Sequence, residues 1–330
     1  MALLAAILLP GACDGPHSVL DPAGDQAAHL HGLLNLMLWV CGIMYALVLG
    51  FLAWALWRTI RRRDAAPPGP DESQRPLRIG LGAWAGLVVA GLILLSTASF
   101  LVDRSLAAAR EHEALSIRIT AHQWWWRVAY RDPASGEWIE TANELYLPAG
   151  RTARLELVAE DVIHSFWVPN LSGKLDVIPG RTNLLDITPR RVGWYRGNCA
   201  EFCGLQHTLM ALDVRVAPPE EFSAWLAAQA ASASQPSDPV LARGQDLFVN
   251  GTCAACHVVR GTPADGRSGP DLTHVGTRRS IAGGALPMNR GNLQGWFLNP
   301  EALKPGTLMP AVVLPSQEAD ALARYLEWLK

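Results

Sequence analysis

The sequence predicts a multidomain chain with three folded parts: a two-helix membrane hairpin, an all-β domain and an all-α domain. Two long apolar segments without charged residues lie near the N-terminus. A central region then alternates apolar and polar residues with a period of two, and the C-terminal region returns to helical spacing. Because strands and helices differ in side-chain period, these changes of period mark the domain borders.

The composition limits the classes of protein to consider. The chain has 330 residues, enough for two or three domains, and half of them are hydrophobic, with 13 tryptophans. This excess of apolar side chains favours a membrane protein. The 28 basic and 30 acidic residues leave a net charge of −2, which gives no support to nucleic-acid binding. Four of the six cysteines form two close pairs with a histidine nearby, as cofactor ligands do.

Residues 21–110 predict the membrane hairpin. The apolar segments 33–57 and 79–102 each exceed the ~20 residues needed to cross the hydrocarbon core. The connecting loop is rich in arginine: Arg58, Arg61, Arg62, Arg63, Arg75 and Arg78. Since basic loops stay on the cytoplasmic side, we expect both chain ends on the periplasmic or outer side.

The first 20 residues resemble a lipoprotein signal. They are short and apolar and contain L-P-G-A-C, which makes Cys13 the candidate for lipidation. A clipped ordinary signal peptide, or a start codon assigned too late, is the alternative.

Residues 111–227 predict an all-β sandwich or barrel. Apolar residues alternate with polar ones at Ile117 and Ile119, at Leu155 and Leu157, and again at Leu212, Val214 and Val216. Turn sequences such as D-P-A-S-G and I-P-G separate these segments. A short helix that begins near Pro218, with Phe222, Trp225 and Leu226 on one face, closes the domain.

Sulfur and nitrogen donors are concentrated in residues 199–210, which read C-A-E-F-C-G-L-Q-H-T-L-M. Cysteine, histidine and methionine suit copper, and a one-copper electron-transfer site needs a single cysteine. The second cysteine therefore favours a dinuclear copper centre on a cupredoxin-like sandwich, with a further histidine from elsewhere in the chain. The predicted ligands are His164, Cys199, Cys203, His207 and Met210. A zinc or iron–sulfur site is the alternative, although zinc usually shows paired C-x-x-C motifs.

Residues 239–330 predict an all-α class I cytochrome c domain, and residues 228–238 a flexible linker before it. C-A-A-C-H at positions 253–257 is the attachment signature of a covalent c-type haem, with Cys253 and Cys256 as thioethers and His257 as an iron ligand. A redox dithiol followed by a chance histidine is the alternative. Met309 is the preferred sixth ligand and Met288 its rival.

Three motifs carry a family resemblance: H-S-F-W-V-P from His164, D-V-I-P-G-R from Asp176, and the cysteine-rich segment 199–210. Together they resemble subunit II of the haem–copper cytochrome c oxidases over residues 20–220, and the remainder resembles a fused cytochrome c. The resemblance implies that Trp124, the first tryptophan after H-Q, receives electrons. It also implies that the backbone carbonyl of Glu201 binds copper, and that its carboxylate joins a Mg²⁺ or Mn²⁺ held mainly by subunit I.

The same resemblance implies the electron-entry subunit of a respiratory oxidase in the bacterial inner membrane. Electrons would pass from the c-type haem to the dinuclear copper and on to the haems of subunit I, where O₂ is reduced to water with proton translocation. Subunits I and III, and cytochrome c or another periplasmic donor, are the implied partners. A component of a nitric oxide or nitrous oxide reductase and a stand-alone copper and haem electron carrier are the alternatives. One departure from the family is the absence of a glutamate in P-L-R-I-G-L-G-A-W at positions 76–84.

Overall fold

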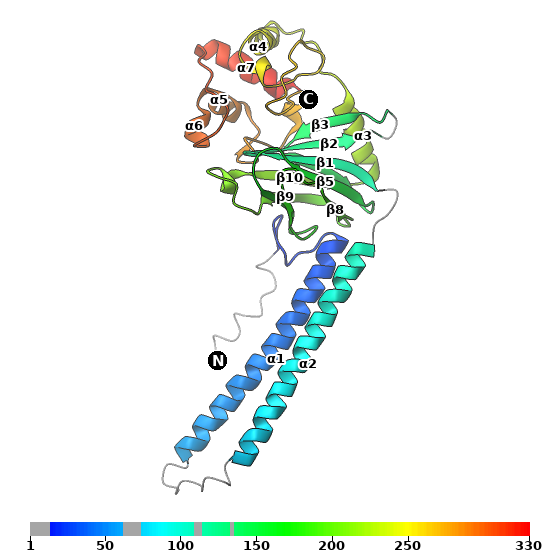
Figure 1. Cartoon of the computed structure of the whole chain (residues 1–330). Helices are drawn as coiled ribbons and strands as arrows, with labels where there is room; N and C mark the ends of the chain where they lie inside the picture. The colour runs from blue at the N-terminus through cyan, green and yellow to red at the C-terminus, as the bar shows by residue number, and fades with distance from the viewer. Residues whose placement is uncertain (1–13, 62–73, 109–113, 133–134) are drawn as a thin grey trace. The chain divides into compact units, whose positions relative to one another are not determined.

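The computed structural model describes residues 14–61, 74–108, 114–132 and 135–330. The chain divides into two compact units, one of Ala28–Arg110 and the other of Met1–Ala27 with Glu111–Lys330. Figure 1 shows the elements coloured along the chain. Cys13, Arg62 and Arg63, to which the sequence assigns a lipid and a topological role, lie outside the described residues.

The smaller unit is a pair of long helices, α1 (Asp25–Arg61) and α2 (Gln74–Ala108) (Figure 1). Both are longer than the apolar segments predicted for them, because polar turns continue each helix beyond its apolar part. Large apolar side chains are exposed along both helices, including Trp39 and Ile93. By length and composition, both helices can cross a membrane.

The larger unit contains a sandwich of two five-stranded sheets. The first sheet has the order β3-β2-β1-β5-β8, formed by β3 (Trp138–Ala142), β2 (Trp125–Arg131), β1 (Leu115–His122), β5 (Ala153–Ala159) and β8 (Asn183–Ile187). The second has the order β4-β10-β9-β6-β7, formed by β4 (Glu144–Pro148), β10 (Ala211–Ala217), β9 (Gly193–Cys199), β6 (His164–Trp167) and β7 (Leu175–Val177). The neighbours β1 and β5, and likewise β4 and β10, are parallel, and the other pairs are antiparallel.

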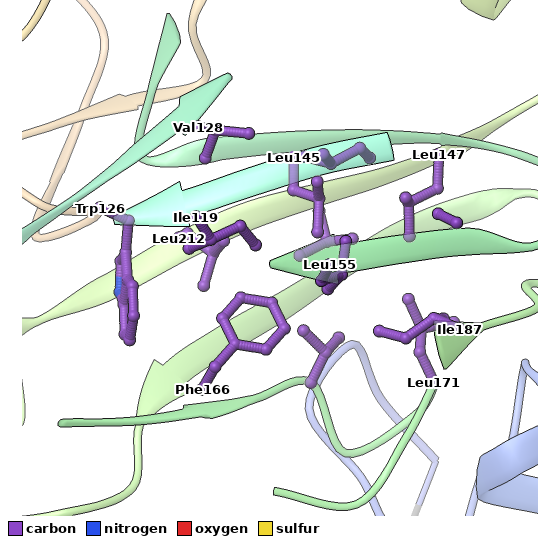
Figure 2. Packing of buried hydrophobic residues seen from close by; sticks show 14 of the residues in the cluster. Ile119, Trp126, Val128, Leu145, Leu147, Leu155, Phe166, Leu171, Ile187 and Leu212 are labelled. Carbon is purple, nitrogen blue, oxygen red and sulfur yellow. The ribbon is translucent and has the colours of Figure 1, made fainter. Parts of the chain in front are cut away.

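The core of the sandwich lies between the two sheets, where the predicted alternation is confirmed. Every second residue of β5 is buried, including Leu155 and Leu157. Figure 2 shows side chains from both sheets meeting there, among them Leu155 of the first sheet and Phe166 of the second. Trp126 is also fully buried, so the strands beneath the candidate metal ligands form a close-packed support.

A short N-terminal segment also belongs to the sandwich. The Ala23 N–H donates to the Asn170 carbonyl at 2.6 Å, and the Thr188 N–H donates to the Gln26 side chain at 2.9 Å. A β-carbon on Gly24 would lie 2.8 Å from the Leu171 carbonyl oxygen, so this approach depends on glycine. The part of the chain that packs on the sandwich therefore includes residues before 28, which the sequence assigned to the hairpin.

Helix α3 (Pro219–Ala230) closes the sandwich, as predicted, and Trp225 stacks on Tyr146 with ring centroids 4.0 Å apart. The helix runs into the first residues of the predicted linker. The following residues are bonded to the C-terminal domain, because the Ala233 N–H donates to the Arg260 carbonyl at 2.8 Å. The predicted linker is therefore attached to this domain around Ala233 rather than free.

The C-terminal domain is mainly helical, with a core around Phe248 and Tyr325. Its elements are α4 (Pro239–Val249), η4 (Cys253–Ala255), η5 (Val275–Thr277), β11 (Ser280–Ile281), β12 (Leu286–Pro287), α5 (Arg290–Leu298), α6 (Pro300–Leu303) and α7 (Ser316–Trp328). The Asp238 side chain caps α4 by accepting the N–H groups of Val240 and Leu241, as the Asp-Pro pair predicts. The small pair β11 and β12 is an addition to the predicted all-α fold.

Candidate functional site

The predicted metal ligands meet at one end of the sandwich. His164 begins β6 and Cys199 ends β9, so two paired strands fix their backbones. Cys203 lies in the loop that follows, which we call the donor loop (residues 199–210). The donor atoms of His164, Cys199 and Cys203 all lie within 4.8 Å of one another, and all three residues are buried.

The two thiols form the centre of this cluster, with their sulfur atoms 3.7 Å apart. His164 Nδ1 lies 3.8 Å from the Cys199 sulfur, and His207 Nδ1 lies 3.8 Å from the Cys203 sulfur. The Met210 sulfur is 3.9 Å from Cys203. The 3₁₀ turn η3 (His207–Leu209) places both His207 and Met210 on the donor loop.

Glu201 contributes its backbone to this cluster. Its carbonyl oxygen lies 3.2 Å from the Cys199 sulfur. Each thiol thus has one imidazole and one weaker donor beside it. A tetrahedral zinc site would use only the two sulfurs and the two imidazoles, whereas the Glu201 carbonyl and the Met210 thioether raise the donors here to six, a number that fits a pair of copper ions.

Asp161 fixes the orientation of the His164 ring. Its carboxylate lies 2.8 Å from Nε2, which leaves Nδ1 toward the cysteines. Burial lowers the pKa of His164, but the hydrogen bonds with Cys199 and Asp161 outweigh it and raise that pKa. Asp161 also accepts the backbone N–H groups of Val162 and Gln123, at 2.7 and 2.6 Å. A ligand whose other nitrogen is held in this way has a defined tautomer.

The two thiols differ in acidity. The hydrogen bond between them lowers the pKa of Cys199, and the bond from His164 acts in the same direction. The same pairing and burial raise the pKa of Cys203. Like-charge repulsion at this distance keeps the second proton on, so a cation is needed before both sulfurs become thiolates.

The candidate haem-attachment residues line a cavity of about 350 Å³ between the C-terminal domain and the Gln123–Trp125 segment of the sandwich. Cys253, Cys256, His257 and Met309 all border it. The His257 Nδ1–H donates to the Pro270 carbonyl at 2.8 Å, which leaves Nε2 free for a metal. Burial lowers the pKa of His257 and so favours the neutral ring. A β-carbon on Gly269 would lie 2.5 Å from this ring, so glycine makes room for it.

The cavity also separates the two candidate sixth ligands. Met309 lies on its wall, whereas Met288 is absent from the described residues that border it. Arg278 borders the cavity too and is largely buried. Its Nε makes no hydrogen bond within the described part of the chain, although Glu144 lies 4.0 Å away. The Arg278 Nη2 donates to the Asp271 carbonyl, so the Nε–H is the donor that remains available to a carboxylate, such as a propionate of a haem.

Trp124 lies between the two candidate sites. Its indole Nε1–H donates to the Cys203 carbonyl at 2.9 Å, and the residue also borders the cavity that Cys253 and Cys256 line. The side-chain amide of Gln123 donates to the same carbonyl at 2.8 Å. The residue predicted to receive electrons is therefore in contact with the donor loop and borders the cavity of the candidate haem ligands.

Sequence reasoning missed several residues that shape these sites: Gln123, Asp161, Arg278 and Lys304. None belongs to a ligand motif. Asp161 stands three residues before His164, a spacing that many loops share by chance. The other contacts join segments far apart in the chain, so no local pattern marks them.

A β-sandwich with a sulfur–imidazole cluster, joined to a cytochrome-like domain and to two apolar helices, defines the class of membrane-anchored electron-transfer proteins. Residues 132–217 match the family described as cytochrome c oxidase subunit II, periplasmic domain. Residues 241–330 match the family described as cytochrome c.

Curated relatives extend this match to the whole chain. The cytochrome c oxidase subunit 2 of Alkalihalophilus pseudofirmus is 33% identical over 95% of this chain and 91% of its own length. That of Bacillus subtilis is 30% identical over 99% of this chain and 96% of its own. The crystal structure of the periplasmic domain of subunit II of cytochrome oxidase from Bradyrhizobium japonicum matches with 31% identity, over 35% of this chain and 93% of that one, at a TM-score of 0.33.

The chain belongs to the cytochrome c oxidase subunit II family, with a cytochrome c domain at its C-terminus. It is a subunit of an oxidoreductase complex and a membrane protein with a periplasmic domain. The resemblance inferred from the sequence motifs is confirmed.

Proposed function

We propose that this chain is the electron-entry subunit of a respiratory cytochrome c oxidase. In this proposal, Cys253, Cys256, His257 and Met309 hold a covalent c-type haem. The dinuclear copper ligands are His164, Cys199, Cys203, His207 and Met210, with the Glu201 carbonyl. Both groups supply reversible one-electron chemistry when bound, and subunit I carries out the reduction of O₂ coupled to proton translocation.

The position of Trp124 is the observation that carries this proposal. Trp124 borders the proposed haem cavity, and its indole donates a hydrogen bond to the carbonyl of Cys203, a proposed copper ligand. The route from the cavity to Cys203 therefore runs through the Trp124 residue and one hydrogen bond. Because this connection is complete inside one chain, the tethered cytochrome domain can serve as the donor to the copper site.

The protein surroundings support the same roles. The His257 ring is held neutral by burial and oriented by the Pro270 carbonyl, as an iron ligand must be. The strands under His164 and Cys199 are close-packed and limit ligand movement during changes of charge. A site whose ligands hardly move needs little rearrangement when an electron arrives.

The wider assembly is also part of the proposal. We expect the chain to function in the bacterial inner membrane, with subunits I and III as neighbours and cytochrome c or another periplasmic protein as external donor. The carboxylate of Glu201 is the candidate ligand for Mg²⁺ or Mn²⁺ at the subunit I border, since carboxylate oxygens suit such hard ions. That site needs further oxygen ligands from subunit I.

Replacement of Cys203 tests the proposal directly. In the full chain within its oxidase, Cys203→Ser should abolish the dinuclear copper absorbance and the turnover that depends on it, because serine cannot bridge two copper ions. The c-type haem absorbance should remain. Metal analysis should fall from about two copper atoms in the wild-type subunit to one or none.

Cys41→Ser is the matched control. Cys41 is an exposed residue of α1, far in sequence from both sites, and its replacement should change neither spectrum. A Cys203→Ser chain that keeps the wild-type copper spectrum, or a wild-type chain that contains zinc, would contradict the proposed function.

A further inference from the structure

The C-terminal domain touches the end of the donor loop through the turn between β11 and β12. Backbone φ is positive at three successive residues of this turn, Ala282, Gly283 and Gly284. The Gly283 carbonyl accepts the backbone N–H of Ala211, the residue after the loop, at 2.8 Å. A β-carbon on Gly283 would lie 3.0 Å from the Trp124 carbonyl oxygen. The turn comes this close because it carries glycine, which tolerates both the left-handed backbone and the lack of space.

Lys304 lies beneath this turn and is almost completely buried, with 3% of its surface exposed. Its Nζ donates to the Ala282 carbonyl at 3.0 Å and to the Leu209 carbonyl at 3.1 Å, and the Trp124 carbonyl lies 3.5 Å away. An ammonium group has three N–H donors and no acceptor, so three carbonyls match its bonding capacity. One of these carbonyls belongs to the cytochrome domain and two belong to the sandwich.

The two carbonyls on the sandwich side are placed next to functional residues. Leu209 directly precedes the candidate ligand Met210, and Trp124 is the residue between the two sites. Lys304 itself is five positions before Met309. A single side chain therefore joins the segments that carry a copper ligand, the intervening indole and a haem ligand.

The buried ammonium group of Lys304 contributes more to the placement of the two domains than to the free energy of folding. Burial lowers its pKa to about 8, although the charge of Cys203 acts in the opposite direction, so the group is mainly protonated at neutral pH. A buried charge gives little net stabilisation because its desolvation cost offsets its bonds. Removal of the ammonium, however, would leave buried carbonyls without a donor, and separation of the domains would hydrate them.

We propose that Lys304 is a positioning residue that fixes the cytochrome domain in one pose on the donor loop, and so sets the distance between the haem and copper sites. The identity of the two groups rests on the proposed function. The inference that the cytochrome domain has one pose rests on the three carbonyl contacts of Lys304 and on the Ala211–Gly283 hydrogen bond.

Hydrogen–deuterium exchange of the full chain in its oxidase complex tests the pose, because the Ala211 amide bonds across the contact. Lys304→Met, which keeps the length and removes the donors, should raise exchange in peptides covering Ala211 by about tenfold. Exchange in β5 should stay at the wild-type level, and both metal-centre spectra should be retained. Pulsed electron paramagnetic resonance should show a broader haem–copper distance distribution.

Lys330→Met is the matched control, since Lys330 is an exposed lysine at the end of the same domain. Gly283→Ala should loosen the same contact between the domains without a change of charge, because its β-carbon would press on the Trp124 carbonyl. It serves as a second variant in case Lys304→Met does not fold. Unchanged exchange at Ala211 and an unchanged distance in both variants would overturn the proposal and leave the proposed function intact. A wild-type chain with a protected Ala211 amide but no dinuclear copper would overturn the proposed function and leave the pose intact.

Discussion

At the residue scale, replacement of Asp161 tests how much the copper affinity of the proposed site depends on residues that are not ligands themselves. In Asp161→Asn, the side chain keeps its shape but places an amide NH₂ where the carboxylate accepts backbone N–H groups. The single oxygen that remains cannot serve all three N–H groups, and the His164 ring loses its negatively charged partner. We expect copper affinity to fall by about 10- to 100-fold, which is typical when the hydrogen-bond partner of a ligand is lost. Competition with a copper chelator measures it.

Glu156→Gln is the control for this substitution. Glu156 pairs with Arg118 on the sandwich surface at 3.0 Å, and both side chains are partly exposed. Exposed pairs contribute little, about 0–1 kcal/mol, so copper affinity should be unchanged. Equal copper affinities for the Asp161→Asn and Glu156→Gln chains would show that the carboxylate beside His164 has no role in metal binding.

Residue identity and spacing predicted which residues would gather at one site, and the structure brings all the proposed copper ligands together. Cysteine, histidine and methionine carry their chemistry wherever they stand, so their presence in one short segment is informative. The roles of Asp161 and Lys304 depend instead on which residues the fold brings next to them. Lys304 contacts a carbonyl 95 positions earlier in the chain, and nothing in the local sequence K-P-G indicates this.

At the element scale, the crossing of α4 and α7 holds the cytochrome domain together. A β-carbon on Gly244 would lie 2.6 Å from the Tyr325 β-carbon and would also collide with the Ala321 carbonyl. Gly244→Ala should therefore force the helices apart and destabilise the domain by about 1–3 kcal/mol, the usual cost of overpacking. A lower midpoint for the heat-induced loss of the haem Soret band would show this.

Gly291→Ala is the matched helix variant. Gly291 lies in the first turn of α5, and a β-carbon there would have only the Asn289 side chain nearby, at 3.5 Å. Removal of backbone freedom from the unfolded chain should leave stability unchanged or raise it by up to about 1 kcal/mol. If both glycine variants unfold at the wild-type temperature, the α4–α7 crossing is looser than the structure indicates.

Most elements followed from side-chain period, but their ends did not. The alternation at Leu155 and Leu157, and the cap at Asp238, gave the strands and α4 directly. The helices α1 and α2 outrun their apolar segments, because helical hydrogen bonds continue into polar turns that hydropathy does not register. The short strands β11 and β12 were also unpredicted, since two residues each are too few to show a period.

At the scale of the whole molecule, the sequence and the family predict that the sandwich and cytochrome domains face the periplasm. An epitope tag placed after Lys330 should be accessible to antibody in intact spheroplasts, and a tag in the arginine-rich loop should become accessible only in inverted vesicles. The reason is that basic loops remain on the cytoplasmic side. Staining of the loop tag in intact spheroplasts would reverse the assigned topology.

The attachment of residues 231–235 has a practical consequence for protein engineering. The Ala233 amide and the Gln235 side chain bond to Arg260 and Gly261, at 2.8 and 3.1 Å. These residues therefore belong structurally to the cytochrome domain. In a chimera that exchanges this domain, the junction between the two proteins should lie just after Ala230. With a junction further downstream, residues 231–235 and the cytochrome domain would come from different proteins, and the hydrogen bonds between them would be lost.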